Sequence, residues 1–129
     1  MKSISTVIIA EAGVNHNGDL GVAMDLIDHA AQAGADMVKF QSFKAKKIVS
    51  ASAPKAAYQA VQSAANESQL DMLKRLELSE VDHQKLINHS NLRGIRFLST
   101  PFDFDSLDLL VKKFALPCIK LGSGELTNA

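Results

Sequence analysis

Two lysines lie inside apolar stretches of the sequence, where a lysine without an anionic partner is rare. Lys39 interrupts DMVKFQ, and Lys120 interrupts PCIKLG. Thr100 and Ser123 add hydroxyl groups, the first before a proline and the second between two glycines. Two cations, two hydroxyls and glycine-flanked backbone amides suit the binding of a phosphate, or of a phosphate together with a carboxylate.

Three further polar side chains accompany this group. Glu11 follows the apolar run VIIA, Gln41 ends the stretch that carries Lys39, and Glu125 ends the motif GSGE. Such side chains suit contacts to sugar hydroxyls, proton transfer or the orientation of a lysine. Each also has an ordinary structural explanation, since Lys39 could extend to the surface and Glu125 could pair with a lysine. A shared site therefore depends on the elements that carry these residues.

The elements that would position these side chains alternate between strand and helix. Four apolar runs predict strands, at residues 5–10, 36–41, 95–98 and 117–121. Helical spacing and capping residues predict helices over residues 19–33, 79–91 and from 103 or 105 onward. This alternation is typical of βαβ units with a parallel sheet. Ligands bind at the carboxyl ends of such strands, so the polar residues after all four strands are expected to converge on one site.

One connection is longer than this pattern requires. Residues 42–78 join the second strand to the next main helix, where two to six residues or so are usual. The stretch ESQLDMLKRL, residues 67–76, predicts a short extra helix within it. We expect this connection to be a functional lid or binding loop, with a disordered insertion as the alternative.

Composition limits the possible classes of protein. Hydrophobic residues make up 47% of the 129 residues and the net charge is zero, which is typical of a globular domain and gives no indication of a nucleic-acid or membrane partner. No apolar run approaches the ~20 residues of a membrane span, and no signal peptide is recognisable, so a cytoplasmic protein is expected. The single cysteine, Cys118, lies in an apolar setting that favours a structural role.

The histidines give weak support to a metal site within this chain. His29, His83 and His89 fall on predicted helices away from the strand ends, and we expect them to be surface or packing residues. His16 is the one histidine expected to approach the site.

Five motifs occur in a fixed order along the chain: AEAGVNHNGDL, GADMVKFQSF, NESQLDMLKRLELS, GIRFLSTPFD and IKLGSGE. In this order and at these spacings they closely resemble the N-acetylneuraminate (sialic acid) synthase family, which includes legionaminate, pseudaminate and spore-coat polysaccharide synthases. The resemblance covers nearly the whole chain. It is specific to the family and much less specific to the substrate of any one member.

The resemblance implies a (β/α)8 barrel enzyme that condenses phosphoenolpyruvate with an N-acetylated sugar aldehyde, typically N-acetylmannosamine. The products are a nine-carbon 2-keto acid and phosphate, a divalent manganese or magnesium ion polarises the aldehyde oxygen, and the enzyme is a homodimer. By position, Glu11 resembles a catalytic carboxylate, and Gln41 and Glu125 resemble sugar contacts. The residues that resemble phosphoenolpyruvate ligands are Lys39, Thr100, Lys120 and Ser123.

A complete barrel of this kind needs about 250 residues. Residues 1–129 are therefore expected to form the N-terminal half of a TIM barrel, with about four strands, and without the later metal ligands and the C-terminal antifreeze-like domain. We expect such a chain alone to be inactive as a synthase. Two alternatives stay open: a sister synthase that uses another amino sugar, and a non-catalytic half barrel that associates with itself.

Overall fold

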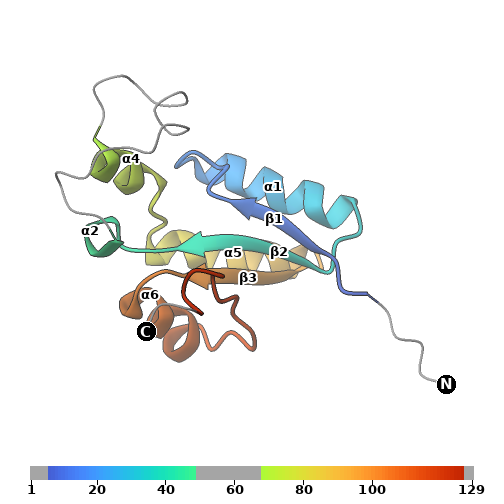
Figure 1. Cartoon of the computed structure of the whole chain (residues 1–129). Helices are drawn as coiled ribbons and strands as arrows, with labels where there is room; N and C mark the ends of the chain where they lie inside the picture. The colour runs from blue at the N-terminus through green and yellow to red at the C-terminus, as the bar shows by residue number, and fades with distance from the viewer. Residues whose placement is uncertain (1–5, 49–67, 127–129) are drawn as a thin grey trace.

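The computed structural model describes residues 6–48 and 68–126 and contains a parallel three-stranded sheet in the order β1-β2-β3 (Figure 1). The strands are β1 (Ile9–Gly13), β2 (Met37–Ser42) and β3 (Arg96–Pro101). The helices are α1 (Leu20–Gln32), α2 (Ala45–Ile48), α4 (Gln69–Leu76), α5 (Glu80–Leu92) and α6 (Phe104–Asp108), the last continued by the π-helix η1 (Leu109–Lys113). The predicted βαβ units with a parallel sheet are confirmed.

The two long helices begin at the capping residues that the sequence indicates. The Asp19 side chain accepts a hydrogen bond from the backbone of α1, and Ser79 forms a reciprocal capping box with Asp82 at the start of α5. α1 joins β1 to β2, α5 precedes β3, and the two helices contact each other. Both helices therefore cover the same face of the sheet, which we call the helix-covered face.

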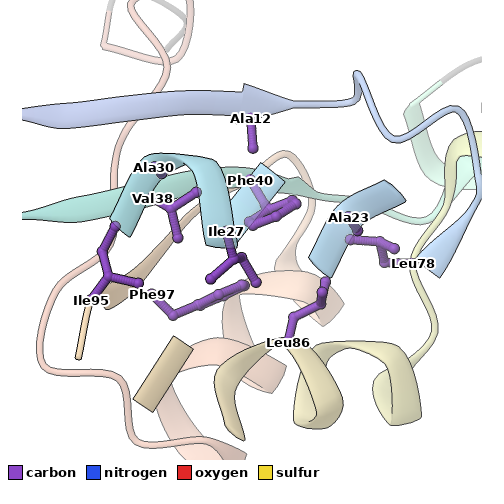
Figure 2. Packing of buried hydrophobic residues seen from close by; sticks show 10 residues of the cluster. All are labelled: Ala12, Ala23, Ile27, Ala30, Val38, Phe40, Leu78, Leu86, Ile95 and Phe97. Carbon is purple, nitrogen blue, oxygen red and sulfur yellow. The ribbon is translucent and has the colours of Figure 1, made fainter. Parts of the chain in front are cut away.

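The apolar core lies between this face and the two helices. Figure 2 shows Phe40 and Phe97 from neighbouring strands directed toward Ile27 of α1 and Leu86 of α5. The rings of Phe40 and Phe97 stack with centroids 5.5 Å apart. Because successive side chains of a strand point to opposite faces, the residues between these core positions point to the other face of the sheet.

The first strand is less buried than its apolar sequence indicates. The strand predicted at residues 5–10 begins only at Ile9 in the structure, and the residues before it are about half exposed, with Val7 at 51% and Ile8 at 54%. The reason is that β1 pairs only with β2 in the described sheet and so forms its edge.

The prediction of a fourth strand at residues 117–121 is wrong for the described structure. This segment follows the outer edge of β3, where the Lys120 N–H donates to the Ser99 carbonyl over 3.0 Å, but it forms no ladder. Pro117 has no N–H to donate, and no further described strand supports the segment from the far side. For the same reason Cys118 is exposed rather than buried in the core as its neighbours indicated.

The long connection after β2 contains α2 and α4, which lie beyond the tips of the strand arrows (Figure 1). The predicted helix at 67–76 is confirmed as α4, which is capped by the Ser68 side chain. The alanine-rich part of the predicted lid, residues 49–67, lies outside the described residues. No helix within the described ranges is long and apolar enough to cross a membrane.

Candidate active site

The face of the sheet opposite α1 and α5, which we call the site face, brings together polar residues from all three strands. Strand register places Glu11 beside Lys39, and Gln41 beside Thr100. These four residues alternate with the core residues of the same strands, so they point away from the helices. The predicted convergence is thus present for the first three strands.

Glu11 and Lys39 form the central ion pair of the site face. Glu11 Oε2 lies 2.7 Å from Lys39 Nζ. The Lys39 side chain is only 11% exposed, whereas the Glu11 side chain is 55% exposed. The lysine is therefore a largely buried cation with one anionic partner, and that partner is reachable from solvent. An added anion could contact the same ammonium group, since a lysine carries three N–H donors.

Gly13 leaves room for this arrangement. Its backbone has φ +56°, and a Cβ at this position would lie 2.9 Å from Glu11 Oε1 and 3.8 Å from Gln41 Nε2. A β-bulge between Glu11 and Gly13 shifts the register, so that Gly13 lies opposite Phe40. Glu11 Oε1 and Gln41 Nε2 therefore both lie near the space that a side chain at position 13 would occupy.

Thr100 supplies an unusual hydroxyl. The residue is 1% exposed, and its Oγ1 is buried without a hydrogen-bond partner among the described residues. A buried hydroxyl that lacks a partner costs free energy, so such an atom is a candidate for contact with a ligand.

The residues of the last motif are near β3 but separate from the ion pair. Lys120 is tied to Ser99 through its backbone, while its side chain and that of Ser123 are exposed. Glu125 lies in the turn that follows and lines a pocket of about 220 Å³ together with Phe102 and Leu121. Within the described part of the chain, no hydrogen bond or ion pair joins these side chains to Glu11, Lys39 or Gln41.

The helix-covered face holds polar residues that the sequence reasoning missed. His83 Nε2 lies 2.7 Å from Ser42 Oγ, which lies 2.7 Å from Ser99 Oγ. His83 was expected away from the strand ends, but it contacts the last residue of β2. Its spacing from Leu86 and Ser90 on α5, which are also buried, was the available signal, because residues three and seven apart share a helix face.

His16 also lies on the helix-covered face. The Gly18 N–H donates to His16 Nδ1 over 3.0 Å, so Nε2 carries the proton, and no described group accepts it. The imidazole is fully buried beside Phe40, with ring centroids 6.3 Å apart. Burial lowers the pKa of His16, opposed by Asp82 and reinforced by His83. His16 therefore does not reach the site face, contrary to expectation.

The turn after β1 is in close contact with α4. Gly18 has φ +83°, and a Cβ there would lie 2.3 Å from the carbonyl oxygen of Arg75 near the end of α4. A side chain at position 18 is excluded by backbone as well as by conformation. The first turn of the site and the end of the long connection are thus packed directly on each other.

The described residues contain no group of three or more histidine, cysteine or carboxylate side chains placed to hold a metal ion. Glu11, the acidic residue of the site face, is paired with a lysine, which is a poor arrangement for a cation site.

The chain is similar in sequence to known sugar-acid synthases. The chain is 56% identical over 123 residues to the N,N'-diacetyllegionaminic acid synthase of Campylobacter jejuni, covering 95% of this chain and 36% of that protein. It is 48% identical over 127 residues to the protein of the same name from Legionella pneumophila, covering 98% and 35%. It spans about a third of the length of these relatives.

A solved structure shows the same fold. The N-acetylneuraminic acid (sialic acid) synthetase of Leptospira borgpetersenii, crystallised with citrate, matches with a TM-score of 0.72 and 29% identity over 94% of this chain and 38% of that chain. The fold is therefore part of a TIM barrel of the sugar-acid synthase type. The model of the NeuB family matches residues 26–129. The chain belongs to the NeuB family.

Proposed function

We propose that the site face is the N-terminal part of an active site that condenses phosphoenolpyruvate with an N-acetylated amino-sugar aldehyde. The observation that carries the proposal is the Glu11–Lys39 ion pair, with a buried cation and a reachable carboxylate, next to Gln41. Thr100 adds a buried hydroxyl without a partner on the strand beside it.

Phosphoenolpyruvate fits the cationic and hydroxyl groups of this face. It carries a phosphate and a carboxylate, and both are strong acceptors for ammonium and hydroxyl donors. Lys39 and Thr100 would bind it from β2 and β3. The segment that carries Lys120 and Ser123 lies beside β3, where the Lys120 N–H donates to the Ser99 carbonyl. These two residues would complete the anion site.

Glu11 would handle a proton beside phosphoenolpyruvate. In the proposed reaction, the methylene carbon of phosphoenolpyruvate forms a bond to the aldehyde carbon, whose oxygen takes up a proton. Water then adds to the resulting cation with loss of a proton, and the tetrahedral intermediate expels phosphate. Oε2 of Glu11 is paired with Lys39, and Oε1 would accept the proton of that water. Gln41 and Glu125 would orient the sugar.

The family resemblance implies a divalent manganese or magnesium ion, which would act as a Lewis acid. The described residues do not fit such an ion, since they form no cluster of suitable ligands. No step of the proposed reaction on this chain's own residues passes through a metal.

The product that the comparisons favour is a diacetyllegionaminic acid. Two relatives of that name are 56% and 48% identical to this chain, whereas the sialic acid synthetase structure is 29% identical. The favoured sugar substrate is accordingly a 2,4-diacetamido hexose, and N-acetylmannosamine is the second candidate.

A binding experiment tests the anion site. Isothermal titration of phosphoenolpyruvate into the 129-residue protein should show binding that Lys39→Met weakens about tenfold or more, because the buried cation is lost. Thr100→Val should also weaken binding. Lys112→Met is the matched control, since Lys112 forms an exposed ion pair with Asp108 away from the site face. Absence of binding by the wild-type protein, or an equal loss in the control, contradicts the proposal.

A chimera tests the reaction. Residues 1–129 would replace the matching third of the Campylobacter jejuni synthase, and phosphate release would be measured with each sugar. We expect turnover with the 2,4-diacetamido hexose, little with N-acetylmannosamine, and none in a Glu11→Gln chimera. The isolated 129-residue protein should show no turnover with either sugar. Absence of turnover with both sugars would contradict the proposed active site.

The exposed edge of β1 favours a second candidate, a half barrel that associates with itself. Unpaired strand edges with exposed apolar side chains are templates for pairing between chains. Sedimentation velocity of the 129-residue protein should then show a dimer that Ile8→Lys dissociates. A monomer at all concentrations would rule this candidate out.

A further inference from the structure

We infer that His83 is a positioning residue that, through the hydroxyls of Ser42 and Ser99, fixes the two strand ends carrying Gln41 and Thr100. The inference rests on the proposed function to this extent: the position of Gln41 and Thr100 affects binding only if they contact substrate. The hydrogen-bond relay itself does not depend on that function.

The direction of the relay follows from its first member. His83 Nδ1 lies 2.8 Å from the Ser79 carbonyl oxygen, which can only accept, so Nδ1 carries the proton. Nε2 must then accept from the Ser42 hydroxyl. Ser42 Oγ, having donated its proton, accepts from the Ser99 hydroxyl. The hydrogen bonds therefore fix the tautomer of His83 on α5 and the hydroxyl orientations of Ser42 on β2 and Ser99 on β3.

Burial makes this relay rigid. Ser42 and His83 are each 1% exposed and Ser99 is fully buried, so water does not compete for their hydrogen bonds. Hydrogen bonds in such surroundings are stronger, and the loss of one member leaves another buried polar group without a partner.

The relay crosses the sheet directly beside the proposed substrate contacts. Ser42 follows Gln41 on β2, and Ser99 precedes Thr100 on β3, while Gln41 and Thr100 are register partners. The relay holds the strand pair together from the helix-covered face, and the proposed substrate contacts point to the site face from the adjacent positions.

The same two serines also anchor the segments that follow the strands. The Ser42 carbonyl accepts from Phe102 N–H, and the Ser99 carbonyl accepts from Lys120 N–H, each over 3.0 Å. A shift of Ser99 would therefore move both Thr100 and Lys120. His83 is the one member of the relay that is not on a strand, so it fixes these groups relative to α5.

Protonation of His83 would reverse the relay. Nε2 would become a donor, Ser42 would have to donate to Ser99, and the Ser99 proton would lose its acceptor. The charged and titratable groups around His83 are Lys44, Asp82 and His16. Burial holds the pKa of His83 below its usual value, opposed by the Ser79 hydrogen bond. The relay should therefore keep its orientation at neutral pH and lose it in acid.

The experiment compares His83→Gln with His29→Gln, which makes the same substitution at an exposed histidine of α1. At neutral pH, His83→Gln should weaken phosphoenolpyruvate binding to the 129-residue protein about tenfold, while His29→Gln should change it less than about twofold. The difference in phosphoenolpyruvate affinity between wild type and His83→Gln should become smaller as the pH is lowered. Ser42→Ala, which keeps the histidine, should weaken binding in the same direction and replaces His83→Gln if that variant does not fold.

Two spectroscopic readouts separate positioning from stability. The ¹⁵N spectrum of the His83 imidazole should show the Nδ1–H tautomer, and the amide protons of Gln41 and Thr100 should exchange faster in His83→Gln than in His29→Gln. The opposite tautomer, or folded His83→Gln protein that binds like the wild type, overturns the inference. If wild-type protein does not bind phosphoenolpyruvate, the proposed function fails, and the tautomer and amide exchange still decide the relay: unchanged exchange overturns it.

Discussion

The two faces of the sheet carry residues of opposite character on the same three strands. On the helix-covered face, apolar residues such as Phe40 and Phe97 form the core, and His83, Ser42 and Ser99 are joined in a buried hydrogen-bond relay. On the site face, a lysine is paired with a carboxylate that is more than half exposed. On β2, Lys39 thus belongs to the site face and its neighbour Phe40 belongs to the apolar core.

The residues that stabilise the fold and the residues proposed to bind a ligand therefore lie mainly on opposite faces of the sheet. Phe40, Phe97 and the relay of His83, Ser42 and Ser99 have their partners within the described structure, whereas Glu11, Gln41 and Thr100 carry polar groups on the site face that a ligand could contact. Substitutions of the apolar core residues should act on the free energy of unfolding, those on the site face on binding, and those in the His83 relay on binding through the position of the strand ends.

The largest effect is expected from Phe40→Ala. Phe40 is fully buried and stacked on Phe97, so its truncation should lower the free energy of unfolding by about 3–5 kcal/mol. Gln41→Ala, one residue along the same strand but on the site face, should lower it by less than about 1 kcal/mol. Urea unfolding of the two variants measures this. Equal losses would mean that the two faces do not differ as described.

A smaller effect is expected from Gly13→Ala. Gly13 and Gly34 both have positive φ, at +56° and +80°, so an alanine at either position should cost about 1–2 kcal/mol. Only Gly13 lies against Glu11, and its Cβ would displace the end of that side chain. Gly13→Ala should therefore also alter phosphoenolpyruvate binding in isothermal titration, and Gly34→Ala should not. A binding loss shared by both variants would point to a general effect of strain.

The smallest effect is expected from lowering the pH. Burial lowers the pKa of both His16 and His83 from the ordinary value of 6.5. As the pH falls below about 6.5, the unfolded chain binds protons before the folded chain does, so the free energy of unfolding should fall until the lowered pKa values are passed. Urea midpoints measured across this range test the sign. A midpoint that rises on acidification contradicts it, and His83→Gln should reduce the slope.

The sequence predicted the parts of the fold that local patterns determine. The capping box at Ser79, the helix that begins after Asp19 and the parallel strands all follow from short-range spacing, and the placement of Glu11, Lys39, Gln41 and Thr100 follows from the alternation of side chains along strands. These predictions needed no knowledge of which element lies beside which.

The features that the sequence did not predict depend on distant partners. The apolar residues before β1 have the pattern of a buried strand, and only the absence of a described second neighbour exposes them. His83 and Ser42 are 41 residues apart, and no local signal pairs them. The exposure of Cys118 likewise depends on whether another strand lies beside residues 117–121, and no described strand does.

The contact between Gly18 and Arg75 has a consequence for how this family varies. A side chain at position 18 would require α4 to move, and α4 forms the last helix of the long connection before α5. Length changes between relatives should therefore be absorbed between α2 and α4, with the distance from α4 to α5 conserved. A survey of insertions and deletions across NeuB sequences would show this as a boundary just before α4.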